Sequence, residues 1–190
     1  TSIGNWAFFR CSSLGNITIP ESVTSIGSSA FFECKNLTSI TIPEGVTSIG
    51  EYTFYGCSKL TTITLPESVT SIGEYVFRGC SGLISLDLTN FNTENVTNME
   101  HMFRGCSGLT ALDVSKFNTS NVTDMEFMFS GCSGLTSLDV TNFNTSNVTN
   151  MRGMFKNCKG FCTYHYGILY DYGSTKLSKD AYQEFLDILN

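Results

Sequence analysis

Cysteine is the residue type in this sequence with the most potential for chemistry, because a thiolate is a nucleophile, a metal ligand and a partner in disulfides. The chain has 190 residues and eight cysteines. Seven of them follow one another at intervals of 23, 23, 23, 26, 26 and 26 residues: Cys11, Cys34, Cys57, Cys80, Cys106, Cys132 and Cys158. A disulfide framework has no reason to be periodic, whereas a repeating structure with one cysteine per repeat does. We therefore predict a column of buried thiols; the alternatives are disulfides between neighbours and a metal site.

The other cysteine and the histidines offer little further chemistry. Cys162 falls outside the regular interval, and we expect it to be the one exposed thiol. The two histidines, His101 and His165, leave little room for a histidine-based triad. The sequence has no phosphate-binding loop, dinucleotide fingerprint or metalloprotease motif, and Cys158 and Cys162 lack the two further ligands that a zinc site needs. We predict that the protein is not an enzyme and has no cofactor and no bound metal.

Three aspartates recur at the 26-residue interval, namely Asp87, Asp113 and Asp139. Carboxylates stacked about 4.8 Å apart repel one another. Calcium prefers such clusters of oxygen ligands, so a bound cation is one interpretation. The interpretation we favour is that solvent surrounds these side chains, or that they accept backbone hydrogen bonds in a turn.

Two repeat types position these residues. The 23-residue unit reads L-T-S-I-T-I-P-E-G-V-T-S-I-G from Leu37 and continues to Phe54 and Cys57. The 26-residue unit reads L-T-A-L-D-V from Leu109 and continues through F-N-T-x-N-V-T-x-M-x-x-M-F to Cys132. A phenylalanine lies three residues before the cysteine in both units. One solenoid therefore runs through both types, with the three extra residues between strand and cysteine.

The apolar pattern predicts the elements of each coil. Ile40 and Ile42 alternate with Thr41, which is typical of a half-buried strand, and the equivalent segments predict one parallel sheet on one face. In the long units, apolar residues at i, i+3, i+6 and i+7 of V-T-x-M-x-x-M-F predict turns and short helical or 3-10 segments on the other face. A single coil cannot bury its apolar side, so stacking must supply the core.

We divide the chain into three segments. Residues 1–82 contain the 23-residue repeats, residues 83–162 continue the same solenoid with 26-residue repeats, and residues 163–190 form a terminal unit. The repeat register predicts a last strand from Phe161 to about Leu169. Ser178 is a suitable N-cap for an amphipathic capping helix over about 179–189. Nothing equivalent stands at Thr1, so we expect further repeats before it.

Two surfaces are candidate binding sites. The first is the outward column of the strand face: Thr18, Thr41, Thr64, Asp87, Asp113, Asp139 and His165. The second lies two residues before the cysteines and changes from aromatic to basic along the stack: Phe9, Phe32, Tyr55, Arg78 and Arg104. This change is consistent either with a contact patch or with a surface that tolerates variation.

The charge balance limits the partners. The formal net charge is −6, from 17 acidic and 11 basic residues, so the sequence lacks the basic character of a nucleic-acid binder. It also gives no reason for attraction to anionic lipid, and no apolar run reaches the length of a membrane span. We expect a monomer that binds neither nucleic acid nor membrane through this segment.

The repeat patterns resemble known families. The pattern L-x-x-I-x-I-P-x-x-V-x-x-I-G-x-x-x-F-x-x-C resembles the BspA-like (treponemal-type) leucine-rich repeat. The 26-residue pattern resembles the companion repeat of bacterial surface proteins and mycoplasma lipoproteins, and the two resemblances cover roughly residues 1–162. They imply a leucine-rich-repeat solenoid and a non-enzymatic bacterial domain, extracellular or on the cell surface. Its implied role is adhesion, through a protein ligand such as host extracellular matrix or another cell surface. The alternative is a structural spacer or stalk that presents other domains.

Overall fold

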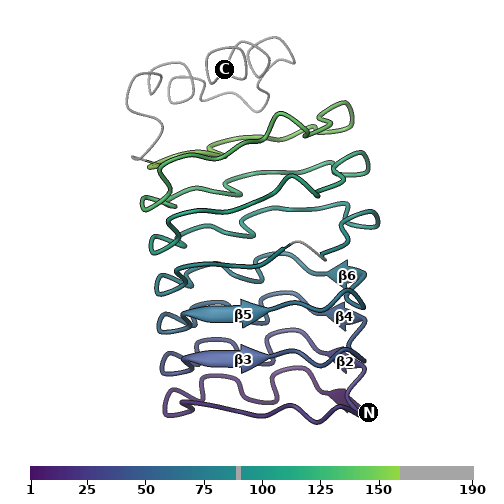
Figure 1. Ribbon diagram of the computed structural model, residues 1–190, viewed down its shortest axis with the longest axis vertical. Coiled ribbons are helices and arrows are strands. Elements are labelled where there is room, and N and C mark those ends of the chain that lie inside the picture. The colour runs from purple at the N-terminus through teal and green to yellow at the C-terminus, as the bar shows by residue number, and fades with distance from the viewer. Residues whose placement is uncertain (89–90, 159–190) are drawn as a thin grey trace.

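The repeats form coils that stack in one column, and both repeat types belong to it (Figure 1). The computed structural model describes residues 1–88 and 91–158, and each coil carries one of the seven cysteines in that part of the chain. The last strand, Cys162, His165 and the capping helix that the sequence predicts lie outside the described residues.

One face of the short repeats carries the predicted parallel ladder. Strand β3 (Ser39–Thr41) pairs in parallel with β5 (Thr62–Thr64), and Ile40 lies opposite Ile63. Both isoleucines are buried, while the residues on either side are exposed. Single bridges extend this ladder by one coil at each end. The in-and-out alternation of the sequence is therefore confirmed on this face.

In the 26-residue repeats, the alternation holds but the predicted strands are absent. Leu112 and Val114 are buried and Asp113 is exposed, yet the segment forms no strand. The Ser115 N–H donates to Oδ1 of Asp113 at 2.9 Å. The carboxylate thus closes a local turn at the position where the short repeats have a proline. The regular ladder ends with the single bridge between Thr64 and Asp87.

A second parallel ladder joins the short coils, and the sequence analysis did not predict it. It contains β1 (Ser2–Ile3), β2 (Ser25–Ile26), β4 (Ser48–Ile49) and β6 (Ser71–Ile72), paired in that order. A glycine follows each of these strands. A Cβ on Gly50 would collide with the backbone nitrogen of Ser28 and lie 2.7 Å from the carbonyl carbon of Gly27. Glycine is therefore what allows the backbones of adjacent coils to come this close.

The return side of the long coils is not helical, which corrects the expected helical or 3-10 segments. The Met102 N–H bonds locally to the Met99 carbonyl, whereas the His101 N–H bonds to the Glu126 carbonyl in the next coil. The φ angle of His101 is 56°, in the left-handed region. A residue in that region interrupts a helix, and every second N–H points to the neighbouring coil. No helix occurs in residues 1–88 or 91–158.

A column of phenylalanine rings fills the centre of the stack. Phe31, Phe54, Phe77, Phe103 and Phe129 are fully buried. Their neighbouring ring centroids lie 5.6–6.0 Å apart, with interplanar angles of 5–7°. The methionines of the long repeats are also buried, as their spacing predicts. Because each ring packs on the ring of the next coil, the core is continuous along the solenoid.

Candidate functional site

The cysteines occupy the core rather than a reactive site. Six of the seven described cysteines are buried, and all seven are free thiols. Cys11 in the first coil is exposed, which corrects the expectation that Cys162 would be the one exposed thiol. The Cys57 Sγ donates to the carbonyl oxygen of Phe31 in the preceding coil at 3.2 Å, and Cys80 makes the same bond to Phe54 at 3.1 Å. Burial raises the pKa of Cys34 to about 11 and that of Cys80 to about 12. These thiols therefore stay protonated at neutral pH, and burial makes them poor nucleophiles.

The strand-face candidates lie in a column of small polar side chains. Thr41 and Thr64 are exposed and face each other across the β3–β5 ladder. The Asp139 Oδ1 accepts the Thr141 N–H at 2.9 Å and its hydroxyl at 2.7 Å, as Asp113 accepts from Ser115. These hydrogen bonds lower the pKa of both aspartates. Within residues 1–88 and 91–158, no group of three histidine, cysteine or acidic side chains is arranged to hold a metal.

The second sequence-predicted patch forms a column of stacked side chains, here called the first column. The rings of Phe9 and Phe32 stack at 5.0 Å between centroids, and those of Phe32 and Tyr55 stack at 4.6 Å. The guanidinium of Arg78 continues the column, with its Cζ 5.3 Å from the Tyr55 ring centroid. Arg104 occupies the same position one coil later. The structure therefore brings all five predicted residues onto one surface.

A second column beside the first was missed by the sequence analysis. Tyr52 and Tyr75 stack at 4.6 Å, Tyr75 and His101 at 4.7 Å, and Phe127 meets His101 edge-on at 5.2 Å. Each of these residues lies five positions before a cysteine and has a positive φ. An aromatic side chain at that repeat position is the sequence feature from which the column could have been found. The two columns together are called the aromatic–arginine surface below.

Every arginine of the sequence lies on this surface. The Cζ of Arg10 lies 5.2 Å from the Phe9 ring centroid, that of Arg104 4.8 Å from Phe127, and that of Arg152 5.6 Å from the same ring. Stacking of a guanidinium on a ring fixes the orientation of its donors while leaving its edge free to bind. The surface thus combines the two residue classes most enriched at protein interfaces.

Glutamates line one side of the second column. The Tyr75 hydroxyl donates to a carboxylate oxygen of Glu100, and the Asn98 amide donates to Oε1 of Glu74 at 2.7 Å. Burial, followed by the nearby carboxylates of Glu51 and Glu100, raises the pKa of Glu74. Burial and the hydrogen bond to Glu100 raise the pKa of Tyr75. The positive centre of the surface is therefore flanked by negative charge.

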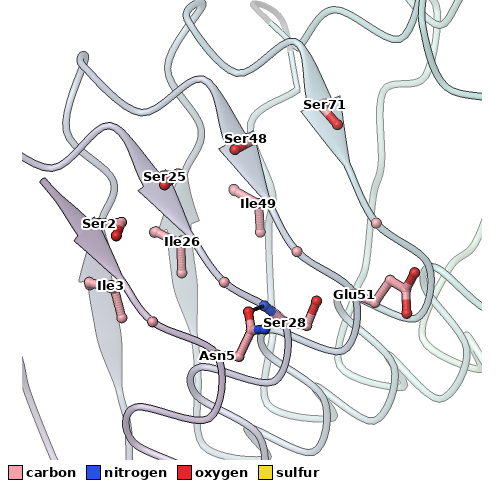
Figure 2. A pocket seen from close by; sticks show the side chains of 14 residues that line it. Ser2, Ile3, Asn5, Ser25, Ile26, Ser28, Ser48, Ile49, Glu51 and Ser71 are labelled. Carbon is pink, nitrogen blue, oxygen red and sulfur yellow. Dashed lines mark hydrogen bonds between the residues drawn. The ribbon is translucent and has the colours of Figure 1, made fainter.

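A separate open groove of about 610 Å³ runs along the second ladder (Figure 2). Its wall is a row of serines, one from each strand, and Asn5, Ser28 and Glu51 lie along its edge. The Asn5 side chain already accepts the Ser28 N–H at 2.9 Å. Glu51 is the single ionisable side chain among the lining residues that the structure describes. The groove therefore offers neutral hydrogen-bonding groups and no acid–base pair for catalysis.

A stack of short coils, with one parallel ladder per face and repeating leucine, isoleucine and phenylalanine positions in the core, defines a leucine-rich-repeat protein. The chain belongs to the BspA-type leucine-rich repeat family, whose model matches residues 1–121 with six copies. A second family model, described as a Mycoplasma protein of unknown function, matches residues 72–176. The family resemblance that the repeat patterns predict is confirmed.

Solved structures agree with this assignment. The chain is similar to a leucine-rich repeat protein from T. pallidum, with 26% identity over 75% of this chain and 73% of that one, and a TM-score of 0.55. It is also similar to a leucine-rich repeat protein from Eubacterium ventriosum, with 31% identity and a TM-score of 0.59. That match covers 80% of this chain and 39% of the Eubacterium chain. No curated protein matches the sequence.

Within residues 1–88 and 91–158, the structure has no helix of the length and apolarity needed to span a bilayer.

Proposed function

We propose that this chain is a non-catalytic, protein-binding domain of an extracellular or cell-surface bacterial protein, and that it binds through the aromatic–arginine surface. The observation that carries the proposal is the continuous stack from Phe32 through Tyr55 to Arg78. Aromatic and arginine side chains contribute most of the binding energy in protein interfaces. The family assignment supports the location, because the resemblance implies surface proteins.

The alternative strand-face site is less suited to this role. Its threonines are short, and Asp113 and Asp139 are already engaged in local turns. A partner on this face would meet the remaining carboxylate oxygens and side chains with little apolar area, and not the aromatic and arginine groups that dominate interfaces. We therefore favour the aromatic–arginine surface as the contact site, with adhesion to host matrix or to another cell as its proposed use.

The test is capture of purified host matrix and serum proteins by the immobilised domain. Phe32→Ser combined with Tyr55→Ser should abolish capture, because both side chains present apolar edges on the surface. Thr41→Ala combined with Thr64→Ala is the matched control on the strand face and should leave capture unchanged. Circular dichroism establishes that both variants remain folded.

Each alternative has its own result. Loss of capture in the threonine variant alone would move the binding site to the strand face. A domain that captures none of these proteins would instead support the spacer or stalk function, in which the solenoid presents other domains.

A further inference from the structure

Two of the arginines on the aromatic–arginine surface differ from the other two in their charge partners. Arg10 pairs with Glu33 at 3.0 Å, and Arg152 lies 3.6 Å from a carboxylate oxygen of Glu126. Arg78 and Arg104 occupy the same position in adjacent coils, between those two. Neither forms an ion pair with any carboxylate of residues 1–88 or 91–158.

The surrounding rings hold both guanidinium groups in place. Arg78 lies over Tyr55 and Tyr75, with its Cζ 5.3 and 5.6 Å from their centroids. Arg104 lies over Phe127 at 4.8 Å. Both side chains are only partly exposed, so little side-chain entropy remains to be lost when a ligand binds. A stacked guanidinium still presents a planar edge of N–H donors that matches a carboxylate.

His101 lies beside Arg104 and does not neutralise the positive charge of the two arginines. His101 Nδ1 lies 3.1 Å from Nη1 of Arg104, and its Nε2 lies 3.4 Å from Oε1 of Glu100. Burial, followed by the charges of Arg78 and Arg104, lowers the pKa of His101 to about 4. At neutral pH the ring is uncharged, so it accepts a hydrogen bond from Arg104 without neutralising the guanidinium.

We propose that Arg78 and Arg104 form a receptor for the carboxylate side chains of an acidic segment in the protein partner, with aromatic or other apolar residues of that segment packing on Phe32, Tyr55 and Phe127. The proposal rests on the proposed function and names its ligand class. The two arginines, in successive coils, donate hydrogen bonds to two carboxylates of an extended peptide. The apolar residues between those carboxylates pack against the edges of the neighbouring rings.

The flanking charges favour a peptide over a polyanionic sugar chain. Glu74 and Glu100 lie beside the second column, and the whole chain carries a net charge of −6. A sulfated polysaccharide carries charge along its whole length and would be repelled by the carboxylates of Glu74 and Glu100 beside the second column. A segment that alternates acidic with apolar residues places its charge only where the arginines lie.

The experiment is fluorescence titration of the domain with a short labelled peptide that alternates acidic and aromatic residues. Its twin carries asparagine and glutamine in place of the acids. The acidic peptide should bind, more weakly at higher salt, and the twin should not. Arg78→Ala with Arg104→Ala should weaken binding at least about tenfold. Lys59→Ala with Lys116→Ala removes the same charge from exposed sites elsewhere and should change the affinity less than about twofold.

One further double variant separates the effect of charge from that of geometry. Arg78→Lys with Arg104→Lys keeps both charges but loses the planar fork, so binding should weaken several-fold. Equal binding of both peptides, an unchanged affinity in the double alanine variant, or arginine-dependent binding of a heparin-type oligosaccharide instead of the acidic peptide would each overturn the proposal.

The two proposals fail in different ways. If the domain captures a matrix or serum protein through Phe32 and Tyr55 but does not bind the acidic peptide, the ligand class is wrong and the protein-binding function stands. If it binds the peptide through the arginines but captures no protein, the carboxylate receptor stands and the host partner is wrong.

Discussion

The guanidinium carbon of Arg78 lies 5.3 Å from the ring centroid of Tyr55, so an arginine continues a stack that aromatic rings begin in the preceding coils. This arrangement lets the surface change from apolar to charged without a break in packing. It also separates binding from stability, because Arg78 contacts ring faces at the surface and not the phenylalanine core.

Arg78→Ala should therefore lower the free energy of unfolding by no more than about 1 kcal/mol, the range for a partly exposed cation–π contact. Urea unfolding followed by circular dichroism measures this. Phe77→Ala is the contrasting variant, because Phe77 is fully buried, and it should cost about 3–5 kcal/mol. A cost for Arg78→Ala close to that of Phe77→Ala would mean that the arginine is part of the core.

Gly50→Ala should destabilise the solenoid by at least about 2 kcal/mol, because the added Cβ would collide with the backbone of Ser28 in the preceding coil. Gly15→Ala is the matched control. A Cβ on Gly15 meets no atom within 4 Å, so that variant should stay within about 1 kcal/mol of the wild type. Thermal and urea unfolding of the two variants provide the comparison. Equal effects at the two positions would show that the close approach of the coils at Gly50 does not constrain the fold.

The buried thiols should make the protein less stable at alkaline pH. Burial raises the pKa of Cys80 from 9.0 to about 12, so above pH 9 the unfolded chain releases a proton that the folded chain retains. The free energy of unfolding therefore falls as pH rises from 9 towards 12, by up to about 1.4 kcal/mol per pH unit for each such thiol. Urea unfolding between pH 8 and pH 11 measures the slope.

Cys80→Ala should make that slope shallower by the contribution of one thiol. Val76→Ala is the control, since it also removes buried volume but no titrating group. It should lower stability by a similar amount at every pH. If both variants kept the wild-type slope, the Cys80 thiol would not contribute to the alkaline loss.

His101 should give the opposite pH dependence. Its pKa falls from 6.5 to about 4 because the ring is buried and faces Arg78 and Arg104. Between pH 6.5 and 4 the unfolded chain binds a proton that the folded chain does not, so the contribution of His101 to stability is lost as pH falls through this range. NMR titration of the imidazole protons measures the midpoint directly. Arg78→Ala with Arg104→Ala should move that midpoint upwards, whereas a wild-type midpoint at 6.5 would contradict the buried, positively surrounded ring.

Much of this fold follows from the sequence because stacking repeats the same burial at the same position. The period of the cysteines predicts the coil, Ile40 and Ile63 predict an inward strand position, and Phe54 predicts the core column. The first column was also visible, because one repeat position changes from Phe32 to Arg78 while the phenylalanine that precedes it stays constant.

The features that were missed depend on hydrogen bonding between coils, which a pattern of apolar residues does not encode. The i, i+3 spacing of Met99 and Met102 suits a helix and a stacked turn equally well. The positive φ of His101 decides between them, and the spacing of apolar residues does not encode that angle. The second ladder was missed because its strands are two residues long, too short for a period-2 pattern.

The bonds from Cys57 to Phe31 and from Cys80 to Phe54 each join one coil to the coil before it, and the phenylalanine rings and both ladders do the same. Tension along the long axis therefore acts on these contacts in series. The coils separate one after another rather than together, and a 23-residue coil releases about 80 Å of extended chain. Under load, the solenoid lengthens in steps, and the coils that have not yet opened keep their shape.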